Sequence, residues 1–266
     1  LEFRRVLFRS RTGKSRFNGT VIKEDGKLVW KRYAYASQNQ RAMDMVWPSV
    51  EGEGSLDAYN DMRYAMVNLR NSDGMSISDS LVEVYPDWAS AHLGQLHYYI
   101  LANDEENLRA TLAVAQSKLE GASLAEKTLI SAYNPDLTRA ERRDVLAKAL
   151  SFAGDDPMLR FWYTWTLESN DEKIAVLESG LARFPENSVL NNMIAYVHMD
   201  NDDMEAARHH LNVYMRVHPD EPNAYDSMGD LLVEMGDTEG AKEMYNKAAE
   251  MHPDFAEVSA AKAAKL

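Results

Sequence analysis

The chain holds seven histidines, the side chains best suited to binding a metal or moving a proton near neutral pH. His209 and His210 are adjacent, so on a helix their rings point about 100° apart and cannot chelate a metal from one face. No His-Glu-x-x-His motif occurs, and the absence of cysteine excludes thiolate nucleophiles and Cys-based zinc sites. The histidine pattern therefore favours packing or solvent-facing roles and predicts no metal centre.

Two other segments contain residue types typical of ligand sites but lack the spacing. The acidic stretch DNDDMEAA, which begins at Asp200, is calcium-like, yet Met204 stands at the third ligand position and no glycine follows. The RTGKS stretch that ends at Ser15 lacks the first glycine of a phosphate-binding loop, because Phe8 stands in its place. No Gly-x-Ser-x-Gly nucleophile elbow occurs. We therefore predict neither a catalytic residue nor a bound cofactor.

The overall charge of the chain narrows the range of partners. Acidic residues outnumber Lys and Arg by 42 to 29, which gives a formal net charge of −13. A chain so acidic repels phosphate backbones, so we expect no nucleic-acid partner. No apolar run approaches the roughly 18 residues that a membrane-spanning helix needs. We expect a soluble protein, and the composition leaves its compartment open between cytoplasm and periplasm.

The first ten residues, LEFRRVLFRS, mix three arginines with large apolar side chains. A helix of this composition would resemble a basic interfacial membrane anchor. The same residues also match an in-frame translation of a common sequencing adapter, and we favour this second interpretation; such segments are excluded from fold reasoning. Residues 1–15 are accordingly expected to be artefact or disordered, with the native N-terminus missing.

A regular period dominates the last third of the chain. Pro185, Pro219 and Pro253 are spaced 34 residues apart, and each follows a helical pattern. Shifting the last unit back by one period places Gly229 on Ala195, so small residues fall where two helices would cross. Proline cannot continue a helix, and here it closes the second helix of each unit. Such a period indicates an array of helical repeats.

The segment NAYDSMGDLLVEMGDTEGAKEMYNKAAEMHPDF resembles a tetratricopeptide repeat. Gly229 and Ala241 occupy its two small positions, and GDTEG supplies the turn between its helices. The preceding unit departs from the family pattern, because Asn191 stands where a large aromatic is usual and Asp202 replaces the turn glycine. The resemblance implies antiparallel helix pairs stacked into a solenoid, and a protein or peptide as the binding partner.

Looser amphipathic pairs continue this pattern upstream. SLAE at Ser123 and TRAE at Thr138 are capping boxes, which start two further helices. We predict an all-α fold, a tetratricopeptide-like α-solenoid of about five helical hairpins over residues 55–266 with a C-terminal capping helix. Residues 16–50 differ, because GTVIKEDGKLVWKRY alternates around an Asp-Gly dipeptide and so favours a short N-terminal β-hairpin, followed by a connecting segment. This segment is either the tail of an upstream domain or a cap on the first repeat.

The family resemblance also implies where a ligand would lie. In tetratricopeptide proteins the concave surface is lined chiefly by inward-facing positions of the first helix of each repeat. The corresponding positions here run from aromatic to acidic: Met158, Phe161, Trp165 and Glu168; Val189, Asn192, Tyr196 and Met199; and Asn223, Asp226, Asp230 and Val233. Aromatic side chains exposed in a concavity are good peptide anchors. The residues alone leave open whether Phe161 and Trp165 line this groove or pack between neighbouring helices.

We predict a non-catalytic scaffold that binds a protein or peptide ligand in this groove. The alternative is the C-terminal interaction arm of an enzyme, or of a signalling or transcription regulator, whose other domain lies upstream. Asp226, Asp230 and Glu234 have the wrong sign for the acidic C-terminal peptides that co-chaperone members of the family hold. They favour a ligand with apolar anchors and some basic residues, whose encounter the acidic side chains would speed.

Overall fold

The computed structural model describes residues 20–24, 27–31, 49 and 55–266. The adapter-like stretch, the RTGKS segment and most of residues 16–50 lie outside the described residues. Strands β1 (Thr20–Glu24) and β2 (Lys27–Lys31) pair antiparallel. The Asp-Gly turn predicted between them is not among the described positions.

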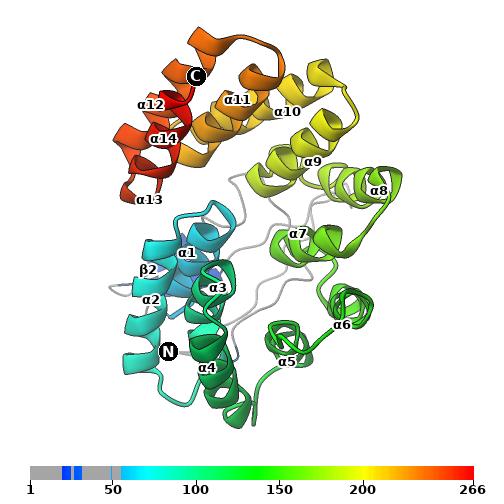
Figure 1. Ribbon diagram of the computed structural model, residues 1–266. Helices are drawn as coiled ribbons and strands as arrows, with labels where there is room; N and C mark the ends of the chain where they lie inside the picture. The colour runs from blue at the N-terminus through cyan, green and yellow to red at the C-terminus, as the bar shows by residue number, and fades with distance from the viewer. Residues whose placement is uncertain (1–19, 25–26, 32–48, 50–54) are drawn as a thin grey trace.

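From residue 55 onward the chain is helical, with short connections (Figure 1). Helices adjacent in sequence pair as α1/α2, α3/α4, α5/α6, α7/α8, α9/α10 and α11/α12, one pair more than the predicted five, and two short helices close the array. The all-α solenoid is confirmed. The elements are α1 (Ser55–Val67), α2 (Asn71–Val84), the 3-10 turn η1 (Ala89–His92), α3 (Leu93–Leu101), α4 (Glu105–Ser117), α5 (Leu124–Ser131), α6 (Arg139–Phe152), α7 (Pro157–Thr166), α8 (Asn170–Leu181), α9 (Ser188–Asp200), α10 (Met204–Val217), α11 (Pro222–Glu234), α12 (Thr238–Met251), α13 (Pro253–Ala256) and α14 (Val258–Ala264).

Side-chain caps determine where several helices begin. Ser123 and Thr138 each accept a hydrogen bond from the backbone N–H of the glutamate three residues later, and that glutamate accepts one from the backbone N–H of the capping residue. Both predicted capping boxes are thus confirmed. Asp203 and Asp237, one repeat apart, cap α10 and α12 through their carboxylates. Each cap satisfies backbone donors that the first turn of a helix otherwise leaves unpaired.

Four of the turns between paired helices contain a residue with left-handed backbone, namely Leu69, Asn103, Asp202 and Gly236. Gly236 adopts a φ of 76°, which glycine reaches without steric cost. Asp202, one repeat earlier, adopts 59°, and Asn103 adopts 54°. Asn and Asp tolerate this region better than other side chains do. The same turn therefore forms at Asp202, where the family's glycine is missing.

A hydrogen bond repeats with the sequence period. Tyr225 donates from its hydroxyl to the carbonyl of Pro219 at 2.8 Å, and Asn191 donates from Nδ2 to the carbonyl of Pro185 at 3.0 Å. Each bond ties the first helix of a repeat to the proline that closes the helix before it. Asn191 thus makes the hydrogen bond to the proline carbonyl that Tyr225 makes in the last repeat, although its side chain is smaller.

The first helices of the pairs lie toward the middle of the molecule. In Figure 1, α1, α3, α5 and α7 face inward, whereas α2, α6 and α8 lie outside them. Helix α1 is the most enclosed of these, because Tyr59, Met62, Arg63 and Ala65 are fully buried. Tyr59 and Met62 join a core cluster that extends through α3, α5 and α7 to the start of α9.

The two ends of the array contact each other. Tyr214 on α10 donates from its hydroxyl to Oδ1 of Asn68, just after α1, at 2.5 Å. His252 Nε2 lies 3.1 Å from Asp73 Oδ2, and the backbone N–H of Ser72 donates to Oδ2 of Asp254 at 2.9 Å. Figure 1 shows the resulting arrangement, with α1 and α2 beside α13. The solenoid therefore curls until its first hairpin meets its last repeats.

Candidate peptide-binding groove

Helix α7 carries the aromatic end of the predicted groove. Pro157 occupies its first position, where a fixed φ suits the first turn. Asp156 caps the helix by accepting a hydrogen bond from the backbone N–H of Leu159 at 3.1 Å. Phe161 and Trp165 are four residues apart and so share one helix face. Their rings meet edge to face, with centroids 6.2 Å apart.

The two aromatic residues differ in exposure. Trp165 is 61% exposed, the largest fraction of any aromatic side chain in the described part of the chain. Phe161 is half-buried and packs against the core cluster of the N-terminal hairpins. Of the two roles that the sequence left open, Phe161 packs in part between helices and Trp165 stays largely in solvent. An exposed indole is the side chain most often found as an anchor in protein interfaces.

Helix α9 supplies Asn192, Tyr196 and Met199, all of them half-buried. The hydroxyl of Tyr196 donates to Oδ2 of Asp230 at 2.7 Å and lies 3.2 Å from the hydroxyl of Ser227. Tyr196 therefore ties α9 to α11 and leaves little of its polar end for a ligand. Met199 packs against the C-terminal core cluster. Internal contacts therefore hold Tyr196 and Met199 in place.

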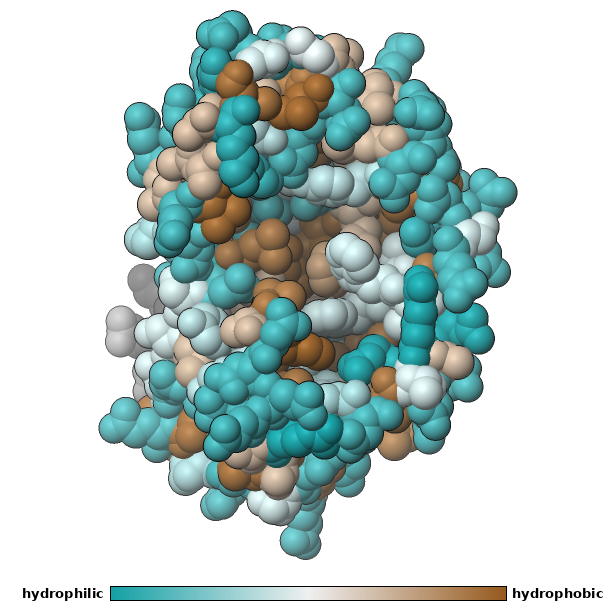
Figure 2. Space-filling view, in the orientation of Figure 1, coloured by the Kyte–Doolittle hydropathy of each residue, from teal (hydrophilic) through white to brown (hydrophobic). Residues whose placement is uncertain are grey.

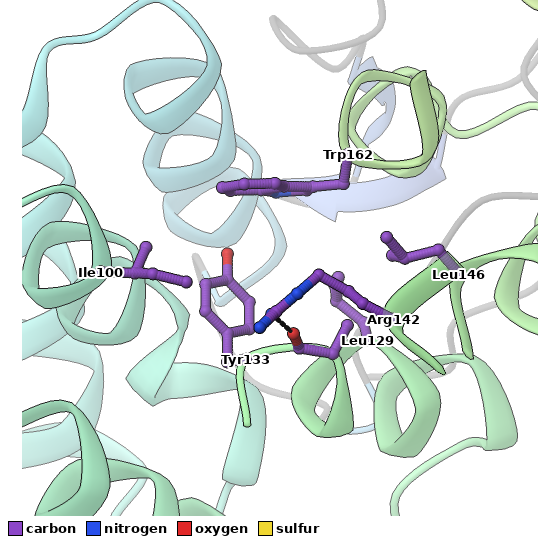
Figure 3. A pocket seen from close by; sticks show the side chains of 7 residues that line it. Ile100, Leu129, Tyr133, Arg142, Leu146 and Trp162 are labelled. Atoms are coloured by element: carbon purple, nitrogen blue, oxygen red, sulfur yellow. Dashed lines mark hydrogen bonds between the residues drawn. The ribbon is translucent and has the colours of Figure 1, made fainter. Parts of the chain in front are cut away.

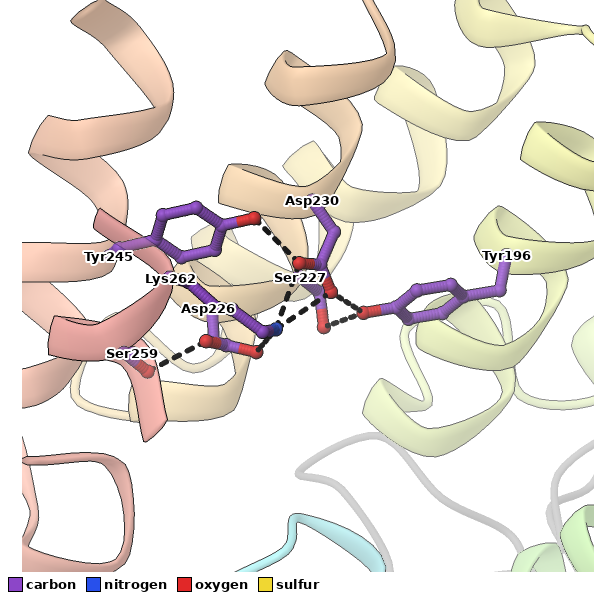
Figure 4. Close-up of polar contacts among 7 residues, drawn as sticks. All are labelled: Tyr196, Asp226, Ser227, Asp230, Tyr245, Ser259 and Lys262. Atoms are coloured by element: carbon purple, nitrogen blue, oxygen red, sulfur yellow. Dashed lines mark hydrogen bonds and ion pairs between the residues drawn. The ribbon is translucent and has the colours of Figure 1, made fainter. Parts of the chain in front are cut away.

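Helix α11 places its acidic residues in a hydrogen-bonded cluster with the end of the chain (Figure 4). Lys262 on α14 donates to Oδ2 of Asp226 at 2.7 Å and to Oδ1 of Asp230 at 2.8 Å. Ser259 on the same helix donates to Oδ1 of Asp226 at 2.6 Å, and Tyr245 donates to Oδ1 of Asp230 at 2.7 Å. Burial lowers the pKa of Lys262, but its hydrogen bonds to the two carboxylates outweigh that effect, and the net pKa is raised. Lys262 therefore stays charged.

In this cluster Asp226 and Asp230 have a structural role. Two carboxylates and one ammonium leave one negative charge. Six donor contacts from side chains of three elements already occupy Asp226 and Asp230. The predicted capping helix is thus held by specific polar contacts as well as by apolar packing. A basic ligand residue would have to share these carboxylates with Lys262 or displace it.

Four of the predicted groove positions are buried, namely Met158, Val189, Asn223 and Asp226. Met158 is fully buried, and its sulfur accepts a hydrogen bond from Nε of Arg63 at 3.3 Å. Asn223 is 2% exposed and donates to the hydroxyl of Tyr214, while Asp226 is 7% exposed. The other predicted positions are half-buried or exposed: Phe161, Trp165, Glu168, Asn192, Tyr196, Met199, Asp230 and Val233.

The face shown in Figure 2 is hollowed at its centre. Apolar and intermediate residues gather in the hollow, and hydrophilic residues surround it. This distribution is typical of a ligand-binding concavity, which is mostly apolar with a polar rim. Within residues 55–266, no group of three potential metal-ligating side chains lies together. None of the helices described is both long and apolar enough to cross a bilayer.

Several residues that organise this region were not predicted from the sequence. The sequence predicts that Lys262 lies on a terminal helix with a polar face. Its three-residue spacing from Ser259 indicates that the two side chains lie on the same face of that helix. Arg63 and Asp156 gave no signal, because each is an ordinary charged residue on an amphipathic segment. Trp162 directly follows Phe161 and so lies on a different face of α7 from the two predicted aromatic positions.

The last repeat matches a known family. Residues 222–255 match the family model described as tetratricopeptide repeat. No curated protein matches the chain by sequence. The fold is thus a tetratricopeptide-like α-solenoid, and its last helix pair is a tetratricopeptide repeat.

Several solved structures of low sequence identity align with this chain. The crystal structure of the APC/C hetero-tetramer Cut9–Hcn1 aligns with a TM-score of 0.52 at 14% identity, over 73% of this chain and 39% of that one. YrrB, titled a TPR protein with an unusual peptide-binding site, aligns with a TM-score of 0.43 at 18% identity, over 71% of this chain and 98% of that one. PilW, titled a widely conserved type IV pilus biogenesis factor, gives 0.45 at 15% identity, over 76% and 97%. The Cut9–Hcn1 alignment supports the fold, and this chain spans well under half of that protein.

Proposed function

We propose that this chain is a non-catalytic scaffold that binds a peptide segment of a protein partner on the inner face of its solenoid, with Trp165 as the main anchor. The tetratricopeptide fold is a scaffold for protein–protein interaction, and this much follows from the fold itself. The finer assignment rests on one observation, the 61% exposure of Trp165 on the first helix of its pair. A large aromatic side chain left in water gains by being covered.

The groove has two ends of different character. At the α7 end, the Trp165 ring packs edge to face against Phe161, and the partial burial of Phe161 holds both rings in position. At the α11 end, Lys262 already neutralises half of the acidic charge. We therefore assign the apolar anchors of the ligand to α7. The acidic end contributes mainly to the rate of encounter with basic residues of the ligand, through the residual negative charge.

The test is a peptide-library selection on the intact chain, followed by affinity measurement with the Trp165→Ala variant. Binding should weaken by roughly 2 kcal/mol or more, because truncating a central aromatic anchor costs that much. The melting temperature should not change, since the side chain is mostly in solvent. Phe152→Ala removes another partly exposed aromatic, on α6, and should leave the affinity unchanged.

Two results would contradict the proposal. Selected peptides that bind the Trp165→Ala variant as tightly as the original chain would place the binding surface elsewhere. A sharp fall in melting temperature would show that Trp165 belongs to the packing of the helices.

A further inference from the structure

The contact that closes the solenoid joins the first hairpin, α1 and α2, to the helices α10–α13, and polar groups make it. Tyr214 on α10 donates to Asn68, and the Tyr64 hydroxyl lies 3.1 Å from Nδ1 of His218. On α13, Asp254 accepts from a backbone N–H of α2 at 2.9 Å. Among the described residues, none of the apolar clusters includes side chains from both sides of this contact. We call this polar contact the seam.

The polar groups of the seam are incompletely paired. His218 Nε2 is buried and has no hydrogen-bond partner within the part of the chain that the structure describes. Burial and the nearby carboxylate of Glu221 both raise the pKa of Tyr64, and burial also raises the pKa of Glu221 itself. Buried polar groups without full pairing are costly, and opening the seam would return them to water. The closed form is therefore less stable than a fully paired contact would make it.

The regions on the two sides of the seam are each held together by apolar packing. Helices α1–α7 share one core cluster, which reaches Val189 at the start of α9. Within this region, side chains of α3, α5, α6 and α7 converge and leave only a small space among them, as Figure 3 shows for Ile100, Leu129, Leu146 and Trp162. A separate cluster joins α9–α12 to α14. Two units move relative to each other unless their interface is large and hydrophobic, and the seam is neither.

One of the predicted groove positions lies at the seam. Asn223, in the first turn of α11, is 2% exposed and donates to the Tyr214 hydroxyl at 3.3 Å. The same hydroxyl donates to Asn68 of the first hairpin, so separation of α1 from α10 would uncover Asn223. We infer that the seam is a latch, which covers the start of the inner face of α11 in the closed chain and opens to expose it. Resting on the proposed function, the latch controls access of the peptide partner to this end of the groove.

The experiment uses the intact chain, which contains no cysteine, with Asn223→Cys as its single thiol. The rate at which a maleimide modifies this thiol measures how often the position becomes exposed. Adding Tyr214→Phe removes the seam hydroxyl and keeps the ring. It should raise the rate by about tenfold, because one buried hydrogen bond changes an equilibrium by about that factor. Tyr225→Phe is the matched control, since its hydroxyl bonds within the last repeats at 2.8 Å, and it should leave the rate unchanged.

A second thiol position separates opening of the seam from unfolding. Ala195 is fully buried in the core cluster of the last repeats, so Ala195→Cys should stay unreactive when Tyr214→Phe is added. Equal acceleration at both thiols would mean that the last repeats unfold, and an unchanged rate at Asn223→Cys would mean that the seam does not act as a latch. Either result overturns the inference. If Tyr214→Phe does not fold, Asp254→Ala, which removes the bond between α13 and α2, decides in the same way.

The affinity of the selected peptides tests the control of access. Tyr214→Phe should bind them several-fold more tightly than the original chain, because the closed contact no longer has to be broken before binding. Tyr225→Phe should keep the original affinity. Unchanged affinity in a variant whose thiol has become reactive would overturn the control of access and leave the peptide-binding proposal intact. Absence of peptide binding to every variant would contradict the proposed function instead, and the thiol rates would still decide whether the latch opens.

Discussion

The last repeats and the first hairpins of this solenoid are held together in different ways. In α9–α12 the main contacts join helices adjacent in sequence. A Cβ added at Gly229 would lie 2.5 Å from the Tyr245 ring, so the two helices pack as closely as the glycine allows. The helices α1–α7 share an apolar core, and they also make buried polar contacts between residues distant in sequence. Arg63 donates to both carboxylate oxygens of Asp156, 93 residues away, at 2.6 and 2.7 Å.

Glu126 is a second example from the first hairpins. It is fully buried, and its Oε1 accepts from the Trp88 indole at 3.0 Å, from the Ser90 hydroxyl at 2.9 Å, and from the backbone and hydroxyl of Ser49. Contacts between sequence neighbours repeat with the period and tolerate variation, as Asn191 and Asp202 show. Buried polar groups satisfy one another as a set, so the loss of one member leaves the others unpaired in a dry environment.

The largest expected effect is the loss of the Arg63–Asp156 pair. Arg63→Ala leaves a buried carboxylate without its cation, and we expect the free energy of unfolding to fall by about 3–5 kcal/mol. Urea denaturation measures this. Arg109→Ala is the matched control, because it removes an arginine that contacts Asp136 at the same 2.6 Å but lies in solvent. Its unfolding midpoint should stay nearly unchanged, and equal losses in both variants would mean that burial is not what makes the Arg63 pair matter.

The next prediction concerns how stability depends on pH, and it compares a histidine in the first hairpins with one in the last repeats. Burial lowers the pKa of His97 on α3 to about 4, against a smaller opposing effect of the Met66 backbone. In the unfolded chain the pKa is about 6.5, so acid protonates the unfolded state first. Stability should be unaffected above about pH 6.5 and fall as the pH drops toward 4, by about 3 kcal/mol at the lower limit.

The comparison of His97→Gln with His210→Gln tests this pH dependence. The pKa of His210 on α10 is also lowered to about 4, chiefly by burial, but its side chain is only half-buried. Water screens His210 more, so its removal should flatten the stability–pH curve less than removal of His97 does. Melting temperatures from pH 4.5 to 7.5 measure both slopes. A curve in His97→Gln that is as steep as in the original chain would refute the assignment.

A smaller effect distinguishes two helix crossings. A Cβ at Gly94 would lie 2.1 Å from the backbone carbonyl oxygen of Gly74, whereas a Cβ at Gly229 meets only the Tyr245 side chain. The α2–α3 backbones would have to separate, so Gly94→Ala should cost roughly 1–3 kcal/mol. Gly229→Ala should cost less, because the Tyr245 ring can shift and alanine favours helix. Chemical denaturation of both variants compares them, and a larger loss at Gly229 would reverse the expected order.

The smallest expected effect concerns the C-terminal capping helix α14. Lys262→Met removes the cation between Asp226 and Asp230 and should destabilise the chain by roughly 1 kcal/mol, because the ammonium is partly exposed and other donors remain. Hydrogen exchange should show faster opening of α14 and little change in α1–α7. Lys265→Met, at the exposed end of the same helix, should have no effect. Uniformly faster exchange would show that the two regions do not open separately.

The sequence allowed much of the helical organisation to be predicted. The capping boxes at Ser123 and Thr138 and the helix-ending prolines act on residues within a few turns of the same segment. They and the 34-residue period can therefore be recognised in the sequence without knowledge of the tertiary structure. The candidate groove was predictable only as positions on α7, α9 and α11. Which of those side chains water reaches depends on contacts with other elements, and Met158 is covered by α1 while Asp226 is covered by α14.

The amino-acid sequence is enough to predict the repeating helix pair, with small residues at the crossings, a break at GDTEG and proline at the end. The curl that brings Asn68 to Tyr214, and the position of Lys262 between Asp226 and Asp230, are visible only in three dimensions. These two kinds of feature differ in how far apart along the chain the interacting residues lie. Helix formation and pair packing depend on neighbours in sequence, whereas burial and charge pairing depend on whichever groups the completed curve brings within a few ångströms.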